Sequence, residues 1–202
     1  MLDKSVPYYT MIMAAPGWDP ARAAPPPPGY TIRPYQDGDE AHWAAIEASV
    51  GEFDQEPDAL AYWEREFRPH LDMVRRRSLF SISPTGEYLG TCTAWEQYDP
   101  RPLFMIHWVA VRPQAQGLGL GGALVCRAME LFRQAGTFPV ILHTQTWSHK
   151  AIRLYHKLGF RPVRSGPASL GKHDYAQAME VLKQVYTPGQ WAALAHAAID
   201  IP

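Results

Sequence analysis

The sequence predicts an α+β fold in which a mixed, mostly antiparallel sheet is flanked by helices. The first half of the chain contains short apolar segments separated by turn residues, such as the hairpin predicted over 79–95 around Pro84-Thr85-Gly86. The second half alternates strand-like segments with amphipathic helical ones. The chain has 202 residues, 47% of them hydrophobic, which suffices for one domain with a substantial core. Hairpins followed by strand–helix repeats are typical of an α+β domain.

The N-terminal segment is separated from the rest by Pro25–Pro28, four consecutive prolines. Proline has no amide hydrogen and a fixed φ, so these residues form an extended spacer. The residues before them include Tyr9, Met11 and Ile12 and are too apolar to remain in solvent, so we expect them to pack on the domain as an added strand. We therefore predict an N-terminal arm and proline-rich linker over 1–29 and one domain over 30–202.

The remaining elements follow from periodicity and from end signals. Strands are predicted over 30–35, 79–82, 88–95, 104–111, 139–144, 160–163 and 175–182. One helix follows Asp37 or Asp39 as its cap and runs to Val50, and a second begins near Pro57 and is interrupted at Pro69. Further helices are predicted over 119–135, 149–158 and 187–198.

Composition excludes several classes of partner. The formal net charge is −1, so no basic excess favours nucleic acid. The two cysteines, Cys92 and Cys126, form neither a disulfide framework nor a metal-binding spacing. No apolar stretch is long enough to span a membrane, and the N-terminus lacks the pattern of a signal peptide. We expect a cytoplasmic protein without metal, membrane or nucleic-acid partners.

The most informative segment is a glycine-rich turn that lies between a predicted strand and a predicted helix. The strand ends at Val111, Pro113 directs the chain out of the sheet, and the glycines follow, at Gly117, Gly119, Gly121 and Gly122. Glycines leave the backbone amides at the start of the helix uncovered, and the helix dipole is positive there. The turn therefore predicts an anion site that suits a pyrophosphate.

Two other interpretations of this turn are open. In the first, the glycines serve only to let the helix pack close to the strand. Alternatively Gly117, Gly119 and Gly122 fit the G-x-G-x-x-G pattern of a dinucleotide-binding fold. That fold expects an acidic residue at the end of the next strand, whereas here the strand ends in Leu142-His143-Thr144.

Two segments together resemble the GNAT superfamily of acetyltransferases. Gln116-x-x-Gly119-x-Gly121, preceded by Val109-x-Val111-x-Pro113, is similar to the pyrophosphate-binding motif of that family. The segment Ser148-x-x-Ala151-x-x-Leu154-Tyr155-x-x-x-Gly159-Phe160 is similar to its later motif. Gln116 stands where the family more often has arginine, and Ser148 where asparagine is usual.

The resemblance implies a sheet flanked by helices in α/β/α layers, acetyl-coenzyme A as co-substrate, and transfer of the acetyl group to a primary amine by direct attack in a ternary complex. The implied cofactor-binding residues are Val109, Ala110, Val111, Gln116, Gly117, Leu118, Gly119, Leu120, Gly121, Gly122, Ser148, Ala151 and Tyr155. The strand backbone at Val109 and Val111 would bind the pantetheine arm, and the amide near Val109 would polarise the thioester. Tyr155 matches the tyrosine that protonates the leaving thiolate in many members.

The proton acceptor has two candidates, His107 and Glu96. His107 lies on the same predicted strand as Val109 and Val111, and strict alternation would place these three side chains on one face. Histidine at this position resembles the arylalkylamine acetyltransferases. Glu96 lies at the end of the preceding strand and could act directly or through water.

The acceptor site is predicted between the first two helices and the hairpin. Carboxylates and aromatic rings there suit a cationic amine with an apolar body; those in the helix connection are Glu47, Glu52, Phe53, Asp54 and Glu56, and further aromatic residues are Trp95, Tyr98 and Trp147. The acceptor can be a small molecule or a peptide, and the chain a monomer or a homodimer. The alternatives to this enzyme are a non-catalytic acyl-coenzyme A-binding or regulatory module and an enzyme that uses a longer acyl group.

Overall fold

The computed structural model describes residues 2–98, 102–171 and 173–201. This part of the chain divides into two compact units, which we describe one at a time. The first unit comprises residues 19–137, and the second comprises residues 2–18 together with 138–201.

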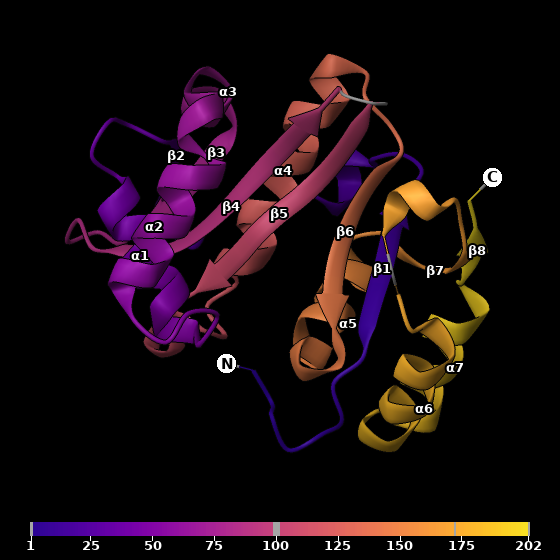
Figure 1. Ribbon diagram of the computed structural model, residues 1–202. Coiled ribbons are helices and arrows are strands. Elements are labelled where there is room, and N and C mark those ends of the chain that lie inside the picture. Colours follow the sequence, from indigo (N-terminus) through magenta and orange to yellow (C-terminus); the bar gives the residue numbers. More distant parts are fainter. Residues whose placement is uncertain (1, 99–101, 172, 202) are drawn as a thin grey trace. The chain divides into compact units, whose positions relative to one another are not determined.

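The first unit holds an antiparallel sheet with the strand order β2-β3-β4-β5 (Figure 1). Its strands are β2 (Thr31–Pro34), β3 (Ser78–Ile82), β4 (Tyr88–Gln97) and β5 (Leu103–Val111). Its helices are α1 (Glu40–Val50), α2 (Glu56–Glu66), α3 (Leu71–Arg77) and α4 (Leu120–Ala135). The predicted hairpin is formed by β3 and β4, and its turn closes where the Gly86 amide donates to the Ser83 carbonyl at 3.0 Å.

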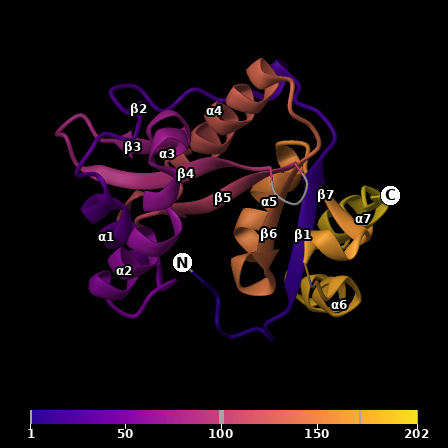
Figure 2. The same ribbon diagram turned by 45° about the horizontal axis from the view of Figure 1, so that its top comes forward.

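The two faces of this sheet are covered by different helices. The face toward α1 and α2 buries large aromatic side chains, and Trp43, Trp63 and Phe67 are each 1% exposed. Helix α4 covers the other face (Figure 2). On this face Leu120 packs with Leu89 and Ala115. The first unit is therefore three layers thick, with the sheet in the middle.

A β-bulge in β5 changes which side chains share a face. Thr93 pairs with His107 but Thr91 pairs with Ala110, so two residues of β5, including Trp108, lie opposite a single residue of β4. Trp108 has a φ of 51°, the left-handed conformation that bulky residues rarely adopt. The expectation that His107, Val109 and Val111 share one face is wrong, because the extra residue moves Val109 and Val111 to the opposite face from His107.

The second unit holds strands in the order β6-β1-β7-β8. They are β6 (Val140–Gln145), β1 (Thr10–Ala15), β7 (Arg161–Ser165) and β8 (Ile199–Asp200), and the helices are α5 (His149–Lys157), α6 (Tyr175–Val185) and α7 (Pro188–His196). Strand β1 pairs antiparallel with β6 and β7, while β8 is parallel to β7. The N-terminal arm thus supplies an inner strand, as predicted, and its residues from Met11 to Ala15 are at most 1% exposed. Mixed, mostly antiparallel pairing confirms the predicted α+β class.

One predicted element has the wrong type. Residues 175–182 were expected to form a strand, but they belong to helix α6. The buried residues are Ala178, Met179, Val181 and Leu182, a spacing that repeats every three to four residues rather than every two. This face packs against β1 and β7, and the packing stabilises a helix rather than a strand.

Two helix boundaries also differ in detail from the expectation. Asp39 occupies the position before α1, but its carboxylate accepts from the Gln36 amide at 2.8 Å and pairs with Arg33 at 2.6 Å instead of capping the helix. Helix α3 follows the interruption at Pro69 and was not predicted. Across the described ranges, no helix combines the length and apolarity that crossing a membrane would require.

Candidate active site

The glycine-rich turn forms an open helix start in the first unit. Gly117 and Gly119 have φ values of 86° and 87°, which glycine adopts without steric cost, and Gly119 directly precedes α4. Among the residues that the structure describes, no side chain caps α4, and the first turn of this helix carries no acidic residue. The first amides of the helix are therefore available to an anion. Gln116 holds the turn to the end of β5, because its Nε2 donates to the Val111 carbonyl at 2.9 Å.

The other predicted cofactor residues of this unit belong to the end of β5 and to the same turn. Ala110 is 4% exposed and packs in the core under α1 and α2, whereas Val111 packs on the α4 side. Leu118 is 45% exposed. The bulge interrupts the regular β4–β5 pairing directly before Ala110, at the backbone segment predicted to bind the pantetheine arm.

The second unit positions the remaining predicted residues on α5. Ser148 directly precedes the helix, Ala151 lies in its first turn, and Tyr155 lies in its last. Tyr155 is 6% exposed, its ring centroid is 6.1 Å from that of Phe160, and its carbonyl accepts from the Phe160 amide at 3.0 Å. Gly159, with a φ of 98°, ends the helix as predicted and lets the chain turn into β7.

His107 lies among aromatic rings on the face of β5 that α1 and α2 cover. Its ring is stacked on Phe67 with a centroid distance of 6.1 Å. The rings of Trp95 and Trp108 are each 5.6 Å away. The imidazole is half-buried, so its position combines an apolar environment with partial access to solvent.

Glu96 lies on the opposite face of the β4–β5 pair and is held by an ion pair. Its carboxylate is 2.9 Å from the guanidinium of Arg77, and the two side chains are 15% and 11% exposed. Arg77 also donates to the Ala94 carbonyl at 2.7 Å and lies over the ring of Phe132 in α4. The structure therefore separates the two candidate bases, with His107 on the α1–α2 side and Glu96 on the α4 side.

Four aromatic residues near His107 form what we call the aromatic cluster: Trp43, Phe53, Tyr62 and Trp108. Every pair among them is in ring contact, with centroid distances between 5.0 Å for Tyr62–Trp108 and 6.2 Å for Trp43–Tyr62. Phe53 was singled out from the sequence, but the other three were not named as site residues. Their common signal is only that they are aromatic, and their convergence from α1, α2 and β5 depends on the fold.

Some of the other residues of the expected acceptor region are buried, and others are exposed to solvent. Glu47 is buried at 1% exposure, whereas Glu52, Asp54 and Glu56 are exposed. Trp147 belongs to the second unit, where its Nε1 donates to the Val6 carbonyl at 2.9 Å. Within the described ranges, no three His, Cys, Asp or Glu side chains gather in a way that could hold a metal ion.

Comparison with known proteins identifies relatives of the chain. A mycothiol acetyltransferase of Thermomonospora curvata is 31% identical over 140 residues, which cover 66% of this chain and 45% of that protein. A protein of the same name from Paenarthrobacter aurescens is 29% identical over 141 residues, covering 66% and 43%. The chain thus spans less than half the length of these curated relatives.

Solved structures show the same fold. A GCN5-related N-acetyltransferase from Sphaerobacter thermophilus superimposes with a TM-score of 0.59 at 24% identity, covering 78% of this chain and 49% of that one. A putative acetyltransferase from Salmonella typhimurium, solved with its cofactor acetyl-CoA, gives a TM-score of 0.51 at 27% identity over 65% of this chain and 79% of that one. The model of the Acetyltransferase (GNAT) family matches residues 35–160, more than half of the chain and including both motif segments. The chain therefore belongs to the GNAT family of acetyltransferases.

Proposed function

We propose that this chain binds acetyl-coenzyme A and transfers its acetyl group to a primary amine by direct attack within a ternary complex. The observation that carries the proposal is the uncapped start of α4, which follows β5 through the glycine-rich turn and offers free amides and a positive helix end to a pyrophosphate. The solved relative that contains acetyl-CoA supports the choice of cofactor. The thioester supplies the activated acetyl group.

Both motif segments contribute residues that we propose to bind the cofactor. In the first segment, Gln116 positions the turn from Gly117 to Gly122 whose amides bind the pyrophosphate, and the backbone from Val109 to Val111 binds the pantetheine arm. The bulge supports this second role, because it frees part of the β5 backbone from regular pairing. In the second motif segment, the proposed cofactor contacts are Ser148 and Ala151 at the start of α5.

His107 is the proposed proton acceptor, rather than Glu96. The amine must lose a proton before its lone pair can attack the thioester carbonyl, and His107 borders the aromatic cluster through Trp108. Glu96 is held by Arg77 on the opposite face, where the ion pair stabilises β4. The C–S bond then breaks, and the Tyr155 hydroxyl donates a proton to the departing thiolate.

The acceptor is proposed only as a primary amine. The curated relatives are named mycothiol acetyltransferases, but this chain spans less than half of their length. The identity of their acceptor is therefore not carried over to this chain. The binding-module alternative predicts the same cofactor site without turnover.

The test is to incubate the purified protein with acetyl-coenzyme A and a panel of primary amines while free thiol and acetylated product are measured. We expect thiol release that depends on the amine and a product whose mass has increased by one acetyl group. Calorimetric binding of acetyl-coenzyme A without thiol release for any amine would favour the module. Failure to bind acetyl-coenzyme A would overturn the whole proposal, and a parallel series with butyryl-coenzyme A tests for a longer acyl group.

A further inference from the structure

Glu47 on α1 is a buried carboxyl group without a complete set of partners. The residue is 1% exposed, and its Oε1 has no hydrogen-bond partner within the described part of the chain. Buried carboxyl groups are normally paired or hydrogen-bonded, because their removal from water is otherwise uncompensated. Burial of Glu47 therefore needs a physical reason, and its surroundings indicate one.

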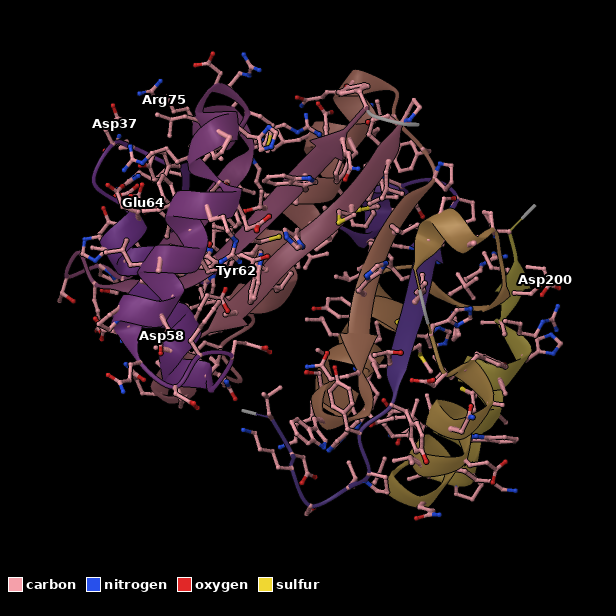
Figure 3. The ribbon with its side chains drawn as sticks, in the orientation of Figure 1. Asp37, Asp58, Tyr62, Glu64, Arg75 and Asp200 are labelled. Atoms are coloured by element: carbon pink, nitrogen blue, oxygen red, sulfur yellow. The ribbon has the colours of Figure 1, made fainter. Side chains whose placement is uncertain are left out.

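The aromatic cluster lies beside this carboxyl group. Trp43 precedes Glu47 by four residues on α1, so the two side chains lie on the same face of the helix. Trp43 is 1% exposed, whereas Phe53, Tyr62 and Trp108 are only partly buried. Figure 3 shows Tyr62 on the side of α2 that faces β5, the strand that carries Trp108. The cluster thus extends from the buried carboxyl group to the surface.

The surface around the cluster is acidic. Residues 52–58 contain four exposed carboxylate side chains, Glu52, Asp54, Glu56 and Asp58, and no basic side chain. Arg65 is bound to Glu66 at 2.7 Å, and its guanidinium lies 5.1 Å from the centre of the Tyr62 ring. Tyr62 therefore already carries a cation near its ring, and excess negative charge around it attracts a second.

We propose that Glu47 and the aromatic cluster bind the ammonium group of the acetyl acceptor, which is therefore a cationic amine with an apolar body. The inference deepens the proposed function and rests on it. An ammonium group supplies the partner that the Glu47 Oε1 lacks, and the aromatic faces stabilise the same charge. Because Trp108 adjoins His107 in sequence and in ring contact, the bound amine lies beside the proposed proton acceptor.

Binding of a cation here must release a proton. Burial, and then the charge of Glu52, raise the pKa of Glu47 well above its ordinary value. The other titratable groups that feel this carboxyl group are Tyr62 on α2 and Cys92 on β4; burial is the main cause of their raised pKa values, and Glu47 adds to it. At a pH below its raised pKa, Glu47 is protonated in the free protein, whereas a bound cation favours the ionised form, so binding at that pH releases the proton.

Calorimetry with benzyltrimethylammonium tests the proposal without any chemistry, because this cation cannot lose a proton. Titrations in two buffers with different heats of ionisation give the number of protons released. We expect tighter binding of the cation than of benzyl alcohol, with proton release between the ordinary and the raised pKa of Glu47. Equal affinity for the two ligands would overturn the proposal.

Matched variants assign the effect to Glu47. Glu47→Gln should weaken binding of the cation by at least about tenfold and abolish proton release. Asp58→Asn removes an exposed carboxylate from the same acidic segment and should change affinity by less than about threefold, because solvent screens it. Unchanged affinity and proton release in Glu47→Gln would contradict the proposal. If that variant does not fold, Tyr62→Leu serves instead and should weaken binding of the cation but not of benzyl alcohol.

The outcome is distinguishable from failure of the proposed function. Binding of the cation by Glu47 without acetyl transfer to any amine supports this site and overturns the activity. Acetyl transfer to benzylamine with the same KM in Glu47→Gln and in Asp58→Asn supports the activity and overturns this site.

Discussion

At the scale of single residues, the two candidate proton acceptors, Glu96 and His107, have different surroundings. Glu96 is an acid at a strand end, which is a plausible proton acceptor, but Arg77 occupies its carboxylate. His107 contacts aromatic rings and is half-buried. Two residues that look equivalent in the sequence thus lie in different environments, one in an ion pair and the other among aromatic rings.

Substitution of the two residues should separate these roles. His107→Gln should remove the rise of kcat/KM with pH that a proton acceptor produces, and lower the plateau by about 10²-fold or more. Glu96→Gln should leave the shape of the profile intact but lower the free energy of unfolding by on the order of 3 kcal/mol, because Arg77 stays buried without its partner. The measurements are pH–rate profiles and denaturant unfolding of both variants. A profile that changes only in Glu96→Gln would reverse the assignment.

At the scale of elements, the start of α4 combines a left-handed backbone conformation at Gly119 with helix amides that no side chain of the described residues caps. Gly119 has the left-handed φ that lets the chain enter the helix, and a Cβ at this position would meet open space. The same residue leaves the first amides uncovered for an anion. The bulge in β5 is the complementary feature, since it alters the strand that leads into this turn.

A pair of substitutions at Gly119 tests the anion site. Asp and Asn tolerate a positive φ better than other residues with a side chain, and both can cap the helix. Gly119→Asp places a negative charge at the amides and should weaken acetyl-coenzyme A binding at least about tenfold more than Gly119→Asn does. Calorimetric affinities give the ratio, and thermal melting confirms equal folding. Equal affinities for the two variants would show that the pyrophosphate binds elsewhere.

At the scale of the whole molecule, segments that are distant in sequence pair with each other in a sheet. Strand β1, from the beginning of the chain, lies between β6 and β7 of the second unit. The contact continues before β1, where the Lys4 ammonium lies 5.3 Å from the ring of Trp147 and the Asp3 carboxylate lies 3.1 Å from His149 at the start of α5. The N-terminal segment therefore stabilises the unit that carries Tyr155.

Truncation of one β1 side chain measures this contribution. Met13 is fully buried, so Met13→Ala should lower the free energy of unfolding by about 2–5 kcal/mol through lost burial and the cavity that remains. Tyr8→Ala, at a position that is 51% exposed, should cost clearly less. Denaturant unfolding monitored by circular dichroism compares them. Equal losses would show that β1 contributes no more than the exposed part of the arm.

Most of the fold follows from local sequence signals. The glycine turn, the Gly159 helix end and the hairpin around Gly86 depend on backbone conformations that glycine favours, so neighbouring residues suffice to predict them. The membership of the family also follows from sequence, because its two motifs are contiguous segments. Helix α6 was predicted as a strand, because only its packing shows which of the segment's apolar residues are buried and that these have helical spacing.

The sequence by itself determined the family, the glycine turn before α4 and the added strand of the arm. Only the tertiary structure decided which side chains act together. The bulge at Trp108 moved Val109 and Val111 away from the face of His107, and Arg77 paired with Glu96. Folding also buried Glu47 beside the rings of three elements. Motifs are read along the chain, whereas burial, charge pairing and strand register depend on residues that only the fold brings together.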